Sequence, residues 1–327
     1  MLTNFAQVKI EPLILSGHKG PVYTLCKAPG SNAFYSGSGD GSLVRWQIGS
    51  IDGEVVARAE EAVFASLVFA DALLFIGTEA GAVHVIDLQS GREIHHFTVH
   101  RKGIFRFLDI GLGRVACAAG DGSLSIWKVQ QGTDRWHVEL FRQIPLIEEK
   151  LRDLEISADR ERLVIAGGDG HLRILETGQF NELVNIEAHT GAISPRVANG
   201  ASSVIFHPSK PVLISGGKDG HLRSWRTDRK LELLHEIPAH KGAIYQIAFV
   251  PTGALCATCS RDGTIKLWDA QTFDPLIRLD RAMHGHTHSV NSILWMDRFL
   301  VSASDDRSIR CWPIDAEAAR TFGANRS

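Results

Sequence analysis

The chain has 327 residues, of which 44% are hydrophobic and 22% are charged. This composition is that of a folded globular protein and excludes an intrinsically disordered chain. The formal net charge of −2, without a basic stripe in the sequence, argues against nucleic acid and anionic membranes as partners.

The cysteines and the apolar stretches bear on the cellular compartment. The five cysteines follow no regular spacing, which favours a reducing compartment over a disulfide framework. The first residues lack the apolar core of a secretory signal. The most apolar stretch, residues 62–77, contains Asp71 and is shorter than a bilayer span, so it is predicted to form two strands and a turn. We therefore expect a cytoplasmic protein.

The first predicted element is a strand-like segment over residues 5–15, and seven copies of a short turn follow it at spacings of 40 to 50 residues. Each copy lies between two short apolar segments. Asp-Gly in such a place predicts a β-hairpin, because a tight turn needs residues that tolerate positive φ. Helical periodicity is weak, so we predict about 28 short strands, four in each of seven units. In chain order the turns are Gly39-Asp40-Gly41, Glu79-Ala80-Gly81, Gly120-Asp121-Gly122, Gly168-Asp169-Gly170, Lys218-Asp219-Gly220, Arg261-Asp262-Gly263 and Asp305-Asp306-Arg307.

Three further positions recur around the turn. A tryptophan follows the aspartate by six residues, a serine or threonine precedes it by four, and a histidine lies in a turn further upstream. These residues are Trp46, Trp127, Trp225, Trp268 and Trp312; Ser36, Ser215, Thr258 and Ser302; and His18, His100, His189, His240 and His286.

This pattern resembles the WD40-repeat family, whose members fold as β-propellers. The resemblance covers nearly the whole chain, although only Trp268-Asp269 keeps the dipeptide that names the family. It implies an all-β, seven-bladed propeller with four antiparallel strands in each blade. We expect one domain over residues 1–315, closed into a ring by the N-terminal strand as the outer strand of the last blade, and a tail over residues 316–327. The repeats are expected at about residues 14–49, 53–91, 92–132, 137–178, 181–228, 231–271 and 274–315.

In this family the recurring histidine, hydroxyl residue, aspartate and tryptophan form a hydrogen-bonded network inside the blade. Repeat 3 has Cys117 at the hydroxyl position, whereas repeats 2 and 4 have lost most of the set. We expect apolar packing alone to hold those two, and their blades to be the least regular. Serine, histidine and aspartate together also suggest a catalytic triad, but their recurrence favours a structural role. The expected network residues are His18, Ser36, Asp40 and Trp46; His100, Asp121 and Trp127; His189, Ser215, Asp219 and Trp225; His240, Thr258, Asp262 and Trp268; and His286, Ser302, Asp306 and Trp312.

Function is expected on one face of the propeller. In the family, the loops that enter each blade and the turns between its second and third strands form the top face, around the mouth of the channel, where partners dock. An enlarged loop near residues 194–202 belongs to the same face. Aromatic and basic side chains there resemble an interaction hot spot. The residues expected to bind a partner are Tyr23, Glu79, Phe105, Lys150, Arg152, Lys218, Tyr245, Arg261, Asn291 and Asp305.

The leading hypothesis is a non-enzymatic scaffold that binds a protein or peptide through its top face. The chain is expected to be a monomer on its own, with no catalytic residue, cofactor or metal. The alternative is an enzyme or metal-binding propeller with a site at the channel mouth. His284 and His288, on either side of the network residue His286 and near Asp305, suggest it because imidazoles bind transition metals.

Two other motifs are weaker. Gly111-Leu112-Gly113 begins a dinucleotide-binding pattern, but a strand rather than a helix is predicted to follow it. Cys256 and Cys259 form a C-x-x-C motif without the second pair that a structural zinc site needs, and positions three apart on a strand face opposite sides.

Overall fold

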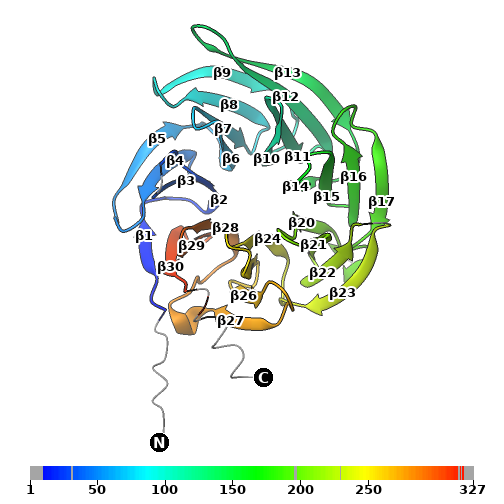
Figure 1. Cartoon of the computed structure of the whole chain (residues 1–327). Helices are drawn as coiled ribbons and strands as arrows, with labels where there is room; N and C mark the ends of the chain where they lie inside the picture. The colour runs from blue at the N-terminus through cyan, green and yellow to red at the C-terminus, as the bar shows by residue number, and fades with distance from the viewer. Residues whose placement is uncertain are drawn as a thin grey trace, which may run out of the picture.

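The structure of the chain is a computed structural model that describes residues 10–30, 32–194, 197–228 and 230–315, together with Glu317 and Ala319. Seven antiparallel sheets of four strands follow one another around a central opening (Figure 1). The predicted fold class, a seven-bladed propeller, is therefore confirmed.

The blades are numbered along the chain by their innermost strand. Blades 1 to 6 are built from strands consecutive in sequence, whereas blade 7 takes its outermost strand from the beginning of the chain. The strands are, for blade 1, β2 (Val22–Lys27), β3 (Ala33–Ser38), β4 (Ser42–Gln47) and β5 (Gly53–Arg58); for blade 2, β6 (Val63–Phe69), β7 (Leu73–Thr78), β8 (Ala82–Asp87) and β9 (Arg92–Thr98); for blade 3, β10 (Ile104–Gly111), β11 (Arg114–Ala119), β12 (Ser123–Gln131) and β13 (Trp136–Pro145); for blade 4, β14 (Leu151–Ile156), β15 (Arg162–Gly167), β16 (His171–Glu176) and β17 (Glu182–Glu187); for blade 5, β20 (Ala201–Phe206), β21 (Val212–Gly217), β22 (His221–Arg226) and β23 (Glu232–Pro238); for blade 6, β24 (Ile244–Phe249), β25 (Leu255–Ser260), β26 (Ile265–Asp269) and β27 (Pro275–Leu279); and for blade 7, β28 (Val290–Met296), β29 (Phe299–Ser304), β30 (Ser308–Pro313) and β1 (Leu13–Ser16).

The hydrophobic core lies between the blades. Each sheet packs face to face on its two neighbours, so the inner strands bury the side chains of both faces. One core cluster joins Ile110 and Ala118 of blade 3 to Leu163 and Ile165 of blade 4. Innermost strands of neighbouring blades contact one another around the ring, and the contact between β28 and β2 completes it.

The N-terminal strand closes the ring as predicted. β1 pairs antiparallel with β30, with Leu13 opposite Cys311 and Ser16 opposite Ser308. Leu15 is only 1% exposed and packs in a core cluster that joins blade 7 to blade 1. Residues 5–9 of the predicted strand lie outside the described residues.

The expected repeats are offset from the blades by one strand. Each range holds the outermost strand of one blade and the three inner strands of the next; residues 53–91, for example, contain β5 and then β6, β7 and β8. Of the expected tail, only Glu317 and Ala319 are described, and Ala319 packs on the core that blades 6 and 7 share. The outer domain boundaries stay predictions.

The expectation that blades 2 and 4 are the least regular is wrong. Both contain four paired strands, like the other blades. Nor is blade 4 held by apolar packing alone, because Arg173 Nη2 donates to Asp169 Oδ2 at 2.6 Å. With Leu175 at the tryptophan position and Ile165 at the hydroxyl position, the turn aspartate bonds to an arginine of the third strand instead.

The turns between second and third strands need an unusual backbone. Gly122 has a φ of 79°, and a side chain there would collide with the carbonyl oxygen of Ile147. This is the physical reason why the repeated turn ends in glycine. In blade 7 the same place is taken by Arg307, with a φ of 66°.

Two small elements lie between blades. The enlarged loop near residues 194–202 begins with a two-stranded hairpin, β18 (Ala192–Ser194) and β19 (Val197–Ala198). A 3-10 helix, η1 (Arg281–Met283), precedes blade 7. No helix in the described part of the chain has the length and apolar character needed to cross a membrane.

Candidate functional site

In blade 1, hydrogen bonds join the second and third strands to the loop before the first strand. The indole N–H of Trp46 donates to Ser36 Oγ at 2.8 Å, and His18 Nε2 lies 2.7 Å from the same oxygen. His18 Nδ1 is 3.6 Å from Asp40. Since Ser36 accepts the indole proton, its own proton can bond to Nε2, which assigns the imidazole proton to Nδ1, on the side of Asp40.

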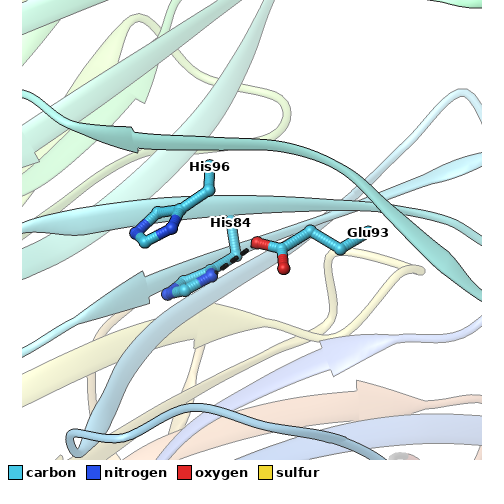
Figure 2. Close-up of side chains that lie close together, drawn as sticks. All are labelled: His84, Glu93 and His96. Carbon is cyan, nitrogen blue, oxygen red and sulfur yellow. Dashed lines mark hydrogen bonds and ion pairs between the residues drawn. The ribbon is translucent and has the colours of Figure 1, made fainter.

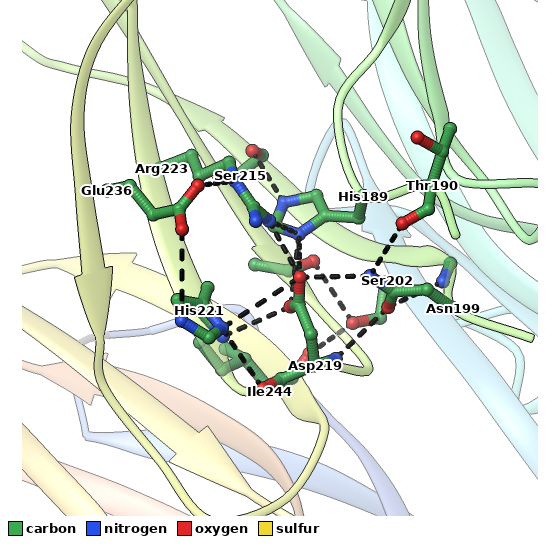
Figure 3. A network of polar contacts seen from close by, with 12 residues as sticks. His189, Thr190, Asn199, Ser202, Ser215, Asp219, His221, Arg223, Glu236 and Ile244 are labelled. Atoms are coloured by element: carbon green, nitrogen blue, oxygen red, sulfur yellow. Dashed lines mark hydrogen bonds and ion pairs between the residues drawn. The ribbon is translucent and has the colours of Figure 1, made fainter. Parts of the chain in front are cut away.

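The same arrangement recurs in blades 5, 6 and 7. The indole N–H lies 2.9, 2.9 and 3.0 Å from the hydroxyl oxygen, and the histidine Nε2 lies 2.9, 2.8 and 2.8 Å from it. In blade 5 the network is wider, because Asp219 also accepts hydrogen bonds from Arg223 at 2.8 Å and from Asn199 at 2.9 Å (Figure 3). The structure thus brings together each of the four sets expected to be complete.

Burial controls the charge of these networks. Burial is the largest cause acting on the pKa of every network histidine, and that pKa is lowered although the neighbouring aspartate raises it, so the imidazoles are neutral near pH 7. Burial by itself would raise the pKa of Asp40, but hydrogen bonds from Ser42 and Lys19 outweigh it and lower that pKa to about 2.

The network hydroxyls are closed to a substrate. A nucleophilic hydroxyl must reach its substrate and give its proton to the adjacent histidine. The hydroxyl residues of the four complete sets are 0% exposed, and each already accepts an indole proton. This geometry supports a structural role and not a catalytic triad.

Blade 3 completes its network from a different strand. Ser125 of β12 accepts from Trp127 Nε1 at 3.0 Å and lies 2.9 Å from His100 Nε2. Cys117, at the expected hydroxyl position, is the cross-strand partner of Ser125, so both side chains reach the same place. The sequence pattern misses Ser125 because it puts the hydroxyl on the second strand. A serine two residues before the tryptophan is the signal that marks it.

Every blade carries a β-bulge at the same place in its first strand. The second residue of that strand is skipped in the pairing with the second strand. A bulge changes the direction in which the side chain of the extra residue points. All seven lie beside the turn between second and third strands, at one end of the ring, which we call the top face. We call the seven residues the mouth ring: Tyr23, Phe64, Phe105, Arg152, Ser202, Tyr245 and Asn291.

Five of the ten residues predicted to bind a partner belong to the mouth ring, and the other five lie in adjacent loops and turns. Phe64 and Ser202 were not predicted. Blade 2 has neither the loop histidine nor the turn aspartate, whereas blade 4 keeps its aspartate, and the inserted hairpin of blade 5 moves Ser202 further from His189. The signal that marks both is the buried residue directly before them, Val63 and Ala201.

Three aromatic rings of the mouth ring form a continuous surface over blades 1 to 3. The rings of Tyr23 and Phe64 meet edge to face at 4.9 Å, and those of Phe64 and Phe105 stack at 5.8 Å. All three side chains are half-buried. We call them the aromatic arc; beyond Phe105, Arg152 Cζ lies 4.5 Å from the centre of its ring.

A cavity of about 800 Å³ continues from the aromatic arc over blades 3 to 6. It brings together Lys150, Arg152, Lys218, Tyr245 and Arg261 from the predicted set. Lys102 and Lys241 also line it, as do the acidic residues Glu148, Glu149 and Asp262. We call it the cationic cavity, since six basic side chains face three acidic ones.

The basic side chains of the cationic cavity act on one another. Burial lowers the pKa of Lys218, and the positive charges of Arg152 and Lys150 lower it further. Within the part of the chain that the structure describes, none of the six basic residues forms an ion pair with a carboxylate within 4.0 Å. Six positive charges held together against three negative ones favour an anionic ligand.

The two acidic predicted residues lie near the aromatic arc, Glu79 in the turn after β7 of blade 2 and Asp305 in the turn after β29 of blade 7. Asn291 Nδ2 donates to Asp305 at 2.7 Å and to the carbonyl oxygen of Val22 at 3.0 Å, which links blade 7 to blade 1. The charges of Asp305 and Glu79, together with burial, raise the pKa of Tyr23. The top face therefore has an aromatic and a cationic sector, and the acidic residues Glu79 and Asp305 act on Tyr23 of the aromatic arc.

The family described as "WD domain, G-beta repeat" matches residues 11–47, 181–226, 231–269 and 278–313. The chain is a WD40-repeat protein. The four matched stretches carry the four complete networks, whereas the stretch between the first two holds blades 2 to 4, where the network is absent or rearranged. The family model thus matches the repeats that contain the complete hydrogen-bonded network.

Curated relatives share parts of the chain. Nuclear distribution protein PAC1 of Candida albicans is 32% identical over 178 residues, 51% of this chain and 35% of that protein. Nuclear distribution protein nudF of Emericella nidulans is 27% identical over 220 residues, 67% of this chain and 40% of that protein. WD repeat-containing protein 37 of Xenopus tropicalis is 34% identical over 106 residues, 30% of this chain and 21% of that protein. The chain spans well under two thirds of the length of these relatives.

The structure does not assemble the alternative metal site. Among the described residues, His284, His288 and Asp305 do not form a group with donor atoms close enough for one ion. His284 ends helix η1 with a φ of 59°, and its carbonyl oxygen accepts from Arg310. His288 Nδ1 lies 2.9 Å from the Thr287 hydroxyl.

The C-x-x-C motif does not form a site either. Cys256 packs in the core between blades 5 and 6, and Cys259 packs in the core between blades 6 and 7. Burial raises the pKa of both thiols. The two sulfurs therefore face opposite sides of blade 6 as inert core groups.

Proposed function

We propose that this WD40-repeat protein is a non-enzymatic scaffold that binds a protein or peptide segment at the mouth ring. The observation that carries the proposal is the contact of the aromatic arc with the cationic cavity, through Arg152 over the ring of Phe105. Aromatic and arginine side chains grouped on one rigid face have the composition of a binding hot spot. The propeller beneath holds them in place with paired strands.

The charges of the cationic cavity, together with the aromatic arc, indicate the chemistry of the partner. Side-chain carboxylates of the partner would enter the cationic cavity, where basic groups lack ion-pair partners among the described residues. An apolar side chain of the same segment would lie on the aromatic arc. We therefore propose a partner segment with acidic residues next to an apolar anchor.

The remaining features concern the setting of the protein. The five cysteines are buried and unpaired, which fits a protein of the reducing cytoplasm. We propose that the chain acts there as a monomer and needs no cofactor to bind its partner at the mouth ring. The mouth ring contains no pair of side chains arranged as a nucleophile and its base, which favours binding over catalysis.

Pull-down experiments from lysate test the mouth ring. We compare the wild type with two variants, a triple alanine variant of Tyr23, Phe105 and Tyr245 and a charge variant with Lys150→Glu and Arg261→Glu. Proteins that bind at the mouth ring are expected to be lost from both variants, and their binding to the wild type is expected to weaken as salt is added.

A matched control carries Arg92→Glu and Lys230→Glu, which change the net charge equally at exposed positions on the outer part of blades 2 and 5. The control is expected to retain the wild-type partners. If both mouth variants bind the same proteins as the wild type, the assignment to the top face is wrong.

A further inference from the structure

Three potential metal ligands lie together on the outer half of blade 2, away from the mouth ring. They are His84 of β8 and Glu93 and His96 of β9 (Figure 2). His84 Nδ1 lies 2.7 Å from Glu93 Oε1, and the rings of His84 and His96 stack with their centres 4.4 Å apart. One donor atom from each residue lies within 4.8 Å of the other two.

The strand register explains why these side chains share a face. His84 and His96 are direct cross-strand partners. Glu93 is three residues before His96, and in a regular strand it would point to the opposite face. A bulge between Val85 and Ile86 leaves Ile94 without a partner and restores Glu93 to the face of the histidines.

Blade 2 has no network to engage His84. Residues at the equivalent place on the third strand include Arg223 and Arg310, which bond to the turn aspartates of blades 5 and 7. Blade 2 has Ala80 in place of that aspartate, so the charge partner is missing. The bond to Glu93 orients the His84 ring instead, and His84 Nε2 is buried without a hydrogen-bond partner among the described residues.

We propose that His84, Glu93 and His96 bind a divalent transition-metal ion of the zinc class. Two imidazole nitrogens and one carboxylate oxygen are ligands that zinc accepts, and three protein ligands leave a coordination position for water. Zinc ligand atoms lie about 3.4 Å apart around a tetrahedral ion, and the stacked rings of His84 and His96 do not point their nitrogens at one place, so the exposed side chains of Glu93 and His96 need to turn for the three donor atoms to converge. The bound ion joins β8 to β9, the two outer strands of blade 2, which is a blade without the hydrogen-bonded network.

Isothermal titration calorimetry with Zn²⁺ tests the site on the tag-free chain of 327 residues. The wild type is expected to bind one Zn²⁺ per chain at this site. His96→Ala, at an exposed position, and Glu93→Gln are expected to weaken that binding by about tenfold or more, because each removes a ligand. His235→Ala removes an exposed histidine from β23, the outer strand of blade 5, and is expected to bind Zn²⁺ like the wild type.

Thermal unfolding with and without Zn²⁺ provides a second readout. Because the ion cross-links two strands, Zn²⁺ is expected to raise the unfolding temperature of the wild type and of His235→Ala, and not that of His96→Ala. The proposal is overturned if the wild type binds no stoichiometric Zn²⁺, or if His96→Ala binds it as tightly as the wild type. Neither result bears on the mouth ring, which lies on other strands.

Discussion

Within a blade, one hydroxyl oxygen joins the tryptophan to the histidine. In blade 1 this oxygen belongs to Ser36 of the second strand, and in blade 3 it belongs to Ser125 of the third. Both serve because cross-strand partners place their side chains on the same point. The network therefore requires a hydroxyl at one position in the blade, and either the second or the third strand can supply it.

Replacement of Ser125 by alanine tests this interpretation. Ser125→Ala leaves the indole N–H of Trp127 and the imidazole of His100 without their buried partner, so the free energy of unfolding should fall by about 1–3 kcal/mol. The control is Ser123→Ala on the same strand, where the backbone N–H and not the hydroxyl bonds to Asp121. Urea unfolding of both variants measures the difference. Equal stabilities would show that Ser125 does not support the network.

Among the elements, β1 is the strand that completes the last blade from the beginning of the chain. Its four residues complete blade 7 and connect the two ends of the described chain, with alternate side chains inside and outside. Without this strand, β30 would be left as the free sheet edge of blade 7.

The two central residues of β1 provide a matched pair for testing closure. Leu15 is 1% exposed and Ile14 is 44% exposed. Leu15→Ala should lower the free energy of unfolding by about 2–5 kcal/mol, since it leaves a cavity between blades 7 and 1. Ile14→Ala should cost less than about 1 kcal/mol. Chemical denaturation compares them, and a Leu15→Ala protein as stable as Ile14→Ala would contradict closure by β1.

For the whole molecule, buried titratable groups link stability to pH. Network histidines whose pKa is lowered by burial are neutral in the folded chain, whereas the unfolded chain protonates them as the pH falls through about 6.5. Stability is thus lost on acidification. Glu155 acts in the opposite direction. Burial raises the pKa of its carboxyl to about 8, although Arg106 lowers it in part. The contribution of Glu155 to the free energy of unfolding is therefore lost as the pH rises from about 4.3 to 8.

We expect the free energy of unfolding to rise from pH 5 to pH 7, because five network histidines outnumber Glu155. Below pH 5 the free energy of unfolding should decrease further, because aspartates with lowered pKa values, such as Asp40, take up protons there. Glu155→Gln removes the opposing group and should steepen the rise between pH 5 and pH 7. Urea unfolding at a series of pH values tests this, and a flat profile for the wild type would refute it.

The sequence by itself determined the number of blades, the strand pattern within each and four of the networks. These features depend on residues within one repeat, such as Asp262 and Trp268, where turn chemistry and strand alternation act at short range. Only the tertiary structure decided which side chains meet across blades. Lys102 and Arg261 line one cavity although 159 positions separate them in the chain, because the ring brings blades 3 and 6 to the same mouth. β-Bulges determined two further placements, because an extra residue in a strand changes the face on which a side chain lies. One bulge places Phe64 in the mouth ring, and another places Glu93 beside His84.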